Sequence, residues 1–409
     1  MSCIVLQLGQ CGNQVGQHVF DTLVEDNQTH VNAAKSTITN RSSVDEYVRN
    51  SLDRFFIQYD NKLIARALAI DTELKVIEQL TNEKAQAKRH WHYEKKCVFE
   101  GRLGSGNNWA CGYRNGSLAE EHILEKLRWQ LEHADRVDTI LPILSLAGGT
   151  GSGLGAYAVE CVRDELPRSF LLTTIVVPYT SGEVVVQNYN SLLTLSHLYH
   201  STDALCRSFL QPIAKKDHSF CDLNYLLEQL LPHTFYKLLT LRCVPQLSDQ
   251  ALDFSTYKWS SLIKTLSQMY INNSYLDEGL NWSLKPFQTR TKSLANVFLS
   301  RSYDKEDLDN ELKQYFNQSD FYSSFLSPSN YYSAFQYRDK SYLNYEKYLS
   351  FVSNCQTPVA SLDRIVNKSW QLFGQKAYLH HYMKYDIDEQ VFLNGFVQIE
   401  QVIKSYNQL

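Results

Sequence analysis

Residues 148–153 read Gly-Gly-Thr-Gly-Ser-Gly and follow an uncharged, mainly apolar run from Thr139 to Ala147. A helical pattern continues from the last glycine to Leu166. Glycines allow several backbone N–H groups to converge on one anion, and the start of a helix adds a partial positive charge. The stretch therefore predicts a phosphate-binding loop between a buried strand and a helix.

Three known loop motifs can be compared with this stretch. A P-loop requires a lysine where Leu154 stands, and a nucleophile elbow requires a glycine where Thr150 stands. Residues 151–156 do fit the dinucleotide pattern G-x-G-x-x-A. The next apolar run, 171–177, lacks the terminal acid that would hold a ribose. An oxidoreductase on a Rossmann-like sheet thus stays open as an alternative.

The order strand, polar loop, helix occurs several times in the chain. Residues 4–8 lead into Gly9 and a helical pattern, and residues 63–70 lead into Asp71 and Glu73. Such alternation is typical of a doubly wound, mostly parallel sheet with ligand loops at the carboxyl ends of its strands. Residues 25–55 and 81–100 are charged and polar, and we expect them to be surface excursions between the sheet units.

Composition narrows the class of protein. The chain has 409 residues, enough for two or three domains, and its formal net charge of -4 gives no global basic field for nucleic acid. The nine cysteines are scattered and odd in number, which favours reduced thiols over a disulfide framework. The first residues carry no basic, apolar leader. We expect a cytoplasmic protein that neither binds nucleic acid nor inserts into a membrane.

Five loops in a fixed order carry a family resemblance. They are Gly9–Gln14, Asp71–Glu73, Gly106–Ala110, Gly148–Gly153 and Gly182–Asn190. Together they resemble the nucleotide-binding face of the tubulin superfamily. Within it the resemblance is closest to the delta-tubulin branch, through residues 104–110, 182–191 and 193–199. It covers nearly the whole chain apart from 25–55 and 303–345.

The resemblance implies a GTP site with Mg²⁺. By position, the residues that would contact the nucleotide are Gln10, Cys11, Asn107, Gly148, Gly149, Thr150, Gly151, Ser152, Gly153, Glu183 and Gln187. Asp71 and Glu73 would hold Mg²⁺ through water, in keeping with the preference of a hard cation for oxygen ligands. Taken without the family, the two acids also fit an exposed helix start.

The resemblance also implies an architecture and a role. It divides the chain into a GTP-binding domain over 1–205, a smaller mixed α/β intermediate domain over 206–355, and a C-terminal helical hairpin over 356–409. The implied role is that of a cytoskeletal subunit in centrioles and basal bodies, acting in triplet microtubules and in cilium or flagellum assembly. Its implied partners are other tubulins, alpha, beta and epsilon, and centriolar proteins. Any GTPase activity would be weak and would depend on a partner subunit, so no catalytic residue is assigned.

The chain departs from the family between Leu205 and Asp222. Only 16 residues stand there, where tubulins have a short helix and the long central helix that contacts guanine. The core helix is therefore expected to be missing, and no residue can be assigned to recognise the guanine base.

Tyr225 occupies the position of the glutamate by which alpha-tubulin activates hydrolysis in its neighbour, and a neutral phenol is a poor proton acceptor. A short isoform, a gene-model error and a nucleotide-free degenerate scaffold all stay open.

Overall fold

The computed structural model describes most of the chain. The described residues are 2–36, 41–60, 62–82, 86–87, 89–101, 104–178, 184–208, 238–247, 259, 261–263, 293–302, 332–339, 342–343 and 345–408. Two compact units are present, the first made of residues 1–205 with 361–404 and the second of residues 206–360 with 405–409. The predicted division into three domains stays a prediction.

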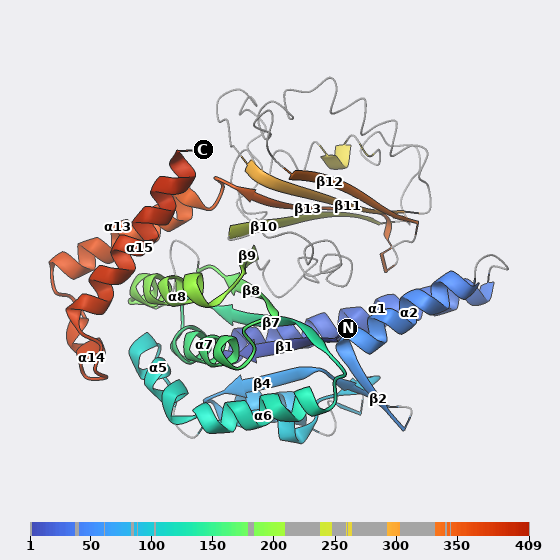
Figure 1. The fold of residues 1–409 in the computed structure, drawn as a ribbon, viewed down its shortest axis with the longest axis horizontal. Helices are drawn as coiled ribbons and strands as arrows, with labels where there is room; N and C mark the ends of the chain where they lie inside the picture. Colours follow the sequence, from blue (N-terminus) through green and yellow to red (C-terminus); the bar gives the residue numbers. More distant parts are fainter. Residues whose placement is uncertain are drawn as a thin grey trace. The chain divides into compact units, whose positions relative to one another are not determined.

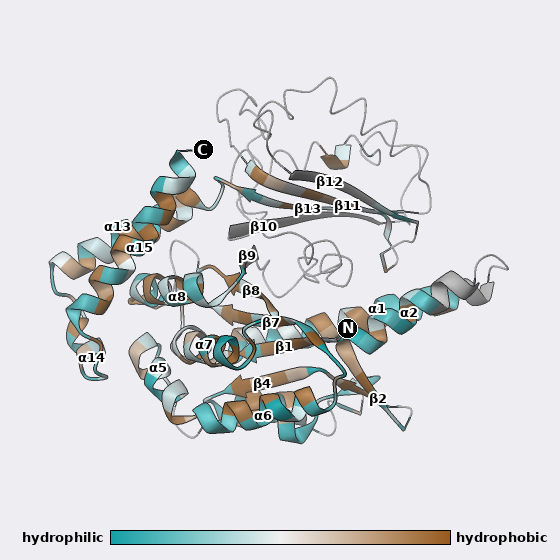
Figure 2. Cartoon of the chain, in the orientation of Figure 1, coloured by the Kyte–Doolittle hydropathy of each residue, from teal (hydrophilic) through white to brown (hydrophobic). Residues whose placement is uncertain are grey.

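A parallel sheet forms the centre of the first unit (Figure 1). The strand order is β9-β8-β7-β1-β4-β6, and the four pairings from β8 to β6 are parallel. The strands are β1 (Ser2–Leu8), β4 (Ala67–Asp71), β6 (Val98–Glu100), β7 (Val137–Ser145), β8 (Phe170–Val176) and β9 (Ala204–Ser208). Every residue of β1 and β4 is buried, as expected for strands covered on both faces. Figure 2 shows these central strands mainly in the hydrophobic colour.

Helices of the first unit pack in two groups. In one, α1 (Gly9–Ser36) contacts α2 (Arg41–Phe55), α3 (Leu74–Thr81) and the strands β1, β4 and β7. The other group packs around α7 (Gly155–Glu165) and comprises α5 (Trp109–Leu118), α6 (Glu120–Glu132) and α8 (Gln187–Ser201). β4 and β7 each run into a loop followed by a helix, and β1 runs directly into α1, so the two loops and the start of α1 gather at the carboxyl ends of these strands. The predicted tubulin-like α/β fold class is confirmed.

The expectation that residues 81–100 are a surface excursion is wrong for part of this segment. Trp91 and Tyr93 are only 2% and 3% exposed, and both rings pack against Phe20 of α1. A small second sheet lies here, in the order β2 (Phe56–Tyr59), β3 (Lys62–Ala65), β5 (Trp91–His92). The aromatic residues supply enough buried area to hold this segment even though its neighbours are charged.

The C-terminal helices of the first unit are α13 (Val359–Gly374), α14 (Leu379–Met383) and α15 (Glu389–Asn407). Along α15 one stripe of side chains is buried, as its four-three spacing predicts. Phe396 of this stripe stacks on Trp370 with ring centroids 3.9 Å apart. Gly395 faces Leu192 and Ser196 of α8, so α15 packs on the body of the unit.

The second unit contains a mixed sheet in the order β12-β11-β13-β10. Its strands are β10 (Leu238–Leu247), β11 (Ser293–Ser302), β12 (Tyr332–Asp339) and β13 (Tyr345–Cys355). β13 pairs antiparallel with both β10 and β11, whereas β11 and β12 are parallel. Residues 209–237, which include the predicted shortening and Tyr225, lie outside the described residues.

Candidate functional site

A cavity of about 230 Å³ lies where the start of α1 and the loops after β4 and β7 meet the loop before α5. Its lining residues are Leu8, Gly9, Gln10, Cys11, Gln14, Asp71, Glu73, Ser105, Gly106, Asn107, Ser145, Gly148, Gly149, Thr150 and Gly151. Nine residues predicted from the sequence are among them, drawn from four segments that are distant in the chain. Parallel strands account for this gathering, because their carboxyl ends share one edge of the sheet.

The glycines of this site serve two different purposes. A Cβ atom added at Gly153 would lie 2.0 Å from the Trp109 carbonyl oxygen, and one at Gly149 would lie 2.7 Å from the Asn108 nitrogen. Those two glycines allow close packing of the loops. At Gly148 the nearest atom would be Asn107 Oδ1, at 3.9 Å, so the backbone there is open toward the cavity. Gly9, with φ +73°, adopts the left-handed conformation and approaches Gly151.

Ser152 and Gly153 lie in a short π-helical segment, Thr150–Leu154, at the end of the cavity lining. The Ser152 hydroxyl is buried and donates to the Gly148 carbonyl oxygen. This hydrogen bond stabilises the segment that follows Gly148. A role of Ser152 and Gly153 in contacting a nucleotide stays a prediction.

Three hydroxyl groups connect the loops beside the cavity. The Thr72 and Thr150 hydroxyl oxygens lie 2.6 Å apart, and the Thr150 hydroxyl donates to Ser105 Oγ at 3.1 Å. Sequence reasoning gave no role to Thr72 or Ser105. Both residues lie inside motifs that the sequence analysis singled out, Asp71–Glu73 and 104–110, and this position could have indicated that they contribute to the site.

Asp71 is a buried carboxylate, and one of its two oxygens lacks a hydrogen-bond partner among the described residues. It is 1% exposed, and its Oδ1 accepts hydrogen bonds from the backbone N–H groups of Thr72 and Glu73. Its Oδ2 has no hydrogen-bond partner among the described residues. Burial raises the pKa of Asp71 to about 6, and the nearby charge of Glu73 also raises it, while the two N–H bonds act in the opposite direction. A cation at Oδ2 would offset the cost of burying the ionised form.

The donor set fits Mg²⁺ better than a transition metal. Within the described part of the chain, no three His, Cys, Asp or Glu side chains form a metal-binding group. Mg²⁺ is usually held by one or two carboxylates together with water and phosphate oxygens. Asp71 and Glu73 both line the cavity and supply two carboxylates.

Gln187 is a further predicted residue that is not among those lining the cavity. Gln187 is buried at the start of α8, where its carbonyl oxygen accepts a hydrogen bond from the Ser191 hydroxyl at 2.7 Å. Glu183 lies outside the described residues. Contacts of either residue with a nucleotide stay predictions.

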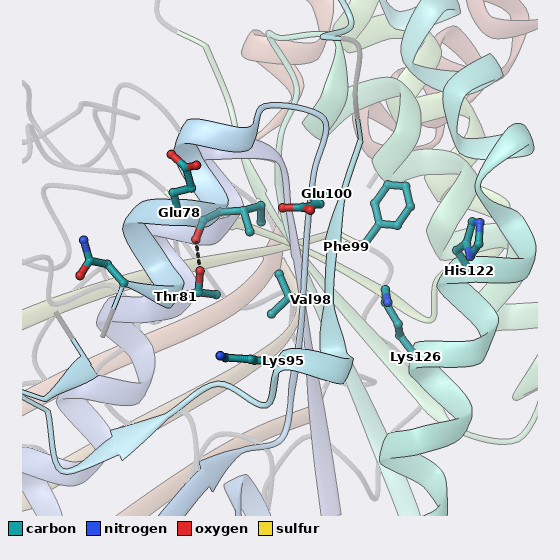
Figure 3. A pocket seen from close by; sticks show the side chains of 10 residues that line it. Glu78, Thr81, Lys95, Val98, Phe99, Glu100, His122 and Lys126 are labelled. Carbon is teal, nitrogen blue, oxygen red and sulfur yellow. Dashed lines mark hydrogen bonds between the residues drawn. The ribbon is translucent and has the colours of Figure 1, made fainter. Parts of the chain in front are cut away.

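A second, larger pocket of about 980 Å³ lies between α3, β6 and α6 (Figure 3). Its rim carries both signs of charge, with Glu78 and Glu100 alongside Lys95 and Lys126. None of the residues predicted from the sequence lines it. The Thr81 hydroxyl in this pocket is already bonded to the Ile77 carbonyl oxygen at 2.9 Å. We therefore place the candidate site at the smaller cavity.

Comparison with known proteins agrees with this geometry. The family model for the GTPase domain of the Tubulin/FtsZ family matches residues 2–207. Tubulin delta chains of Macaca fascicularis and Homo sapiens are each 36% identical to this chain, with 99% of both chains covered. The tubulin delta chain of Mus musculus is also 36% identical, with full coverage of both chains.

The alignments are longer than this chain. Those with the first two relatives extend over 457 positions, whereas the chain has 409 residues. Some positions of these relatives therefore have no counterpart here, in keeping with a shortened segment. Among the described residues, no helix combines the length and the apolar character needed to cross a membrane.

Proposed function

This chain belongs to the tubulin family as a delta-tubulin-like subunit, and from that premise we propose that its loop cavity binds GTP together with Mg²⁺. The family's GTPase domain implies binding of GTP. The observation that supports this site most strongly is the gathering of three loops, one of them glycine-rich, and the start of α1 around a single cavity with two carboxylates.

The residues have distinct tasks in this proposal. Backbone N–H groups at Gly148 to Gly151 hold the phosphates, with Asn107 on the opposite loop and Gln10 and Cys11 beside them. Asp71 and Glu73 hold Mg²⁺ through water. The cation supplies positive charge that offsets the repulsion between phosphate oxygens and the two carboxylates.

Tubulin family membership supports interaction with other tubulins and a place in the cytoskeleton. We propose more narrowly that the subunit acts at centrioles and basal bodies, in triplet microtubules and in the assembly of cilia or flagella. Alpha-, beta- and epsilon-tubulin and centriolar proteins are its proposed partners. The delta-chain identity of its full-length relatives supports this role. Hydrolysis of GTP is proposed to be weak and to depend on a neighbouring subunit.

The test is to purify the chain, denature it and identify the released nucleotide by chromatography. Guanine nucleotide is the expected result. Release of NAD(H) alone would favour the oxidoreductase alternative, and release of no nucleotide, together with no GTP binding on titration, would favour the nucleotide-free scaffold.

A matched pair of variants tests the carboxylates. Asp71→Asn with Glu73→Gln should reduce Mg²⁺-dependent GTP binding by about tenfold or more, a difference of about 1.4 kcal/mol. Glu78→Gln with Glu100→Gln removes the same charge from the second pocket and should leave binding unchanged. Equal losses in the two double variants would contradict the proposed Mg²⁺ position.

A further inference from the structure

Asn190 of α8 lies at a junction of hydrogen bonds behind the cavity. Its side chain is fully buried. Its Nδ2 donates to the Asn107 carbonyl oxygen at 2.9 Å and to the Ala147 carbonyl oxygen at 2.8 Å. Its Oδ1 accepts from the Trp109 backbone N–H at 3.0 Å and from the Tyr382 hydroxyl at 2.7 Å.

These four bonds occupy both donors and both acceptor positions of the amide. The reversed orientation of the amide would place its NH₂ group against the Trp109 N–H donor and its oxygen against two carbonyl oxygens. A buried amide in such an environment has one stable orientation, because each unmade hydrogen bond costs about 1–3 kcal/mol. Asn190 is therefore a rigid link between the groups that it contacts.

The two carbonyl groups belong to the loops that form the cavity. Asn107 itself lines the cavity and has φ +52°, and Ala147 directly precedes Gly148. Trp109 begins α5, the helix that follows the Asn107 loop. One side chain thus fixes the backbone of the two loops proposed to hold phosphates.

The same junction reaches α14 of the C-terminal helices. Tyr382 is fully buried, and its ring packs against Tyr189 and Phe392 with centroids 5.6 and 5.2 Å away. A second hydrogen bond also involves α14: Asn108 Nδ2 donates to the His381 carbonyl oxygen at 3.0 Å. α14 is therefore held by two hydrogen bonds, one from Tyr382 to the Asn190 side chain of α8 and one to His381 from Asn108 beside the cavity.

We propose that Asn190 is a positioning residue that couples the nucleotide site to α14 through Tyr382. This inference rests on the proposed nucleotide binding. A ligand that draws the Asn107 and Gly148 loops together favours the arrangement in which Asn190 makes all four bonds, and that arrangement orders α14. Linkage is reciprocal, so a change that loosens α14 must weaken nucleotide binding by the same factor.

Three variants separate this coupling from a simple packing role. Tyr382→Phe removes only the hydroxyl that donates to Asn190. Asn190→Asp keeps both acceptor roles and removes both donations to the loop carbonyls. Tyr189→Phe is the matched control, since the Tyr189 hydroxyl has no hydrogen-bond partner among the described residues and its ring belongs to the same cluster.

The experiment combines GTP titration with hydrogen exchange of peptides spanning α14, with and without GTP and Mg²⁺. In the unmodified chain, GTP should increase amide protection in α14. Tyr382→Phe should weaken GTP binding about threefold to tenfold and abolish that increase, while Tyr189→Phe should keep both affinity and response. Asn190→Asp should weaken GTP binding by more than tenfold.

The outcomes are distinguishable. If the unmodified chain binds no guanine nucleotide, the proposed function fails and the coupling fails with it. If the chain binds GTP but α14 responds equally in Tyr382→Phe and Tyr189→Phe, the coupling alone is overturned. Should Asn190→Asp fail to fold, the comparison of the two phenylalanine variants still decides.

Discussion

The hydroxyl oxygens of Thr72 and Thr150 lie 2.6 Å apart although 78 residues separate them in the chain. Thr72 follows β4 and stands beside Asp71, and Thr150 belongs to the glycine loop after β7. This bond joins the side of the cavity that carries the carboxylates to the side formed by the glycine loop. It keeps Asp71 in register with the glycine loop before any ligand arrives.

We expect Thr72→Val to lower the free energy of unfolding by about 1 kcal/mol, because the hydrogen bond to Thr150 is lost. Urea unfolding without nucleotide measures the change. A double-mutant cycle with Thr150→Val isolates the pair, and an interaction energy of about 0.5–1.5 kcal/mol is expected. Strictly additive losses would show that the two hydroxyls do not cooperate. Thr81→Val, which removes a hydroxyl bonded within α3, serves as a control.

Two half-buried thiols provide a direct test of where the nucleotide sits. Cys11 lines the cavity, whereas Cys111 lies on α5 and is not among the lining residues. GTP with Mg²⁺ should slow the reaction of Cys11 with N-ethylmaleimide several-fold and that of Cys111 much less. Peptide mass spectrometry resolves the two sites. Protection of both thiols alike would indicate a general tightening of the fold in place of occupancy of the cavity.

Much of the first unit could be predicted from the sequence because its strands are continuous apolar runs. Residues 4–8, 139–147 and 171–177 each correspond to an observed strand within a few residues, whereas the run 63–70 is divided between β3 and β4, which belong to different sheets. Parallel pairing then brings the loops after these strands to one edge. Gathering of the Gly9, Asp71 and Gly148 segments thus follows from the pattern of strands and loops alone.

Other features depended on distances that no sequence pattern contains. The hydroxyl contacts of Thr150 and the four bonds of Asn190 arise only when segments distant in sequence meet. The buried Trp91 and Tyr93 were hidden in a charged stretch, because two aromatic side chains can anchor a segment without any periodicity. Close packing at Gly149 and Gly153 was also hidden, since glycine has the same appearance in a sequence whether its space is filled by a ligand or by a neighbouring backbone.

A buried thiol in β1 predicts a loss of stability at alkaline pH. Burial raises the pKa of Cys3 to about 12, from 9.0 for a free thiol. Between these values the folded chain keeps a proton that the unfolded chain has lost, so the free energy of unfolding falls as pH rises. This thiol should lower the free energy of unfolding by about 1.4 kcal/mol for each pH unit above 9.

Urea unfolding between pH 8 and 10.5 measures this dependence on pH. Cys3→Ala should reduce the alkaline slope of the free energy of unfolding by that amount, whereas Cys111→Ala keeps the buried thiol and should retain the slope. Equal slopes in the unmodified chain and Cys3→Ala would contradict the assignment.

Gly153→Ala should reduce the stability of the fold, whereas Gly148→Ala should leave stability almost unchanged and weaken GTP binding. At Gly153 the new Cβ would lie 2.0 Å from the Trp109 carbonyl oxygen and 2.8 Å from the Tyr113 nitrogen, both backbone atoms. Relief of that overlap requires movement of α5, so Gly153→Ala should lower the free energy of unfolding by about 3 kcal/mol or more.

At Gly148 the new Cβ meets only the Asn107 side chain, at 3.9 Å. The free energy of unfolding of Gly148→Ala should therefore stay within about 1 kcal/mol of that of the unmodified chain, and it should rise slightly if the unfolded chain loses conformational freedom. GTP affinity should nevertheless fall about tenfold or more in Gly148→Ala, because the methyl group occupies space that the phosphates need. Thermal unfolding without nucleotide, followed by GTP titration of each folded variant, measures both effects. A Gly148→Ala variant that binds GTP normally would show that the phosphates lie elsewhere in the cavity.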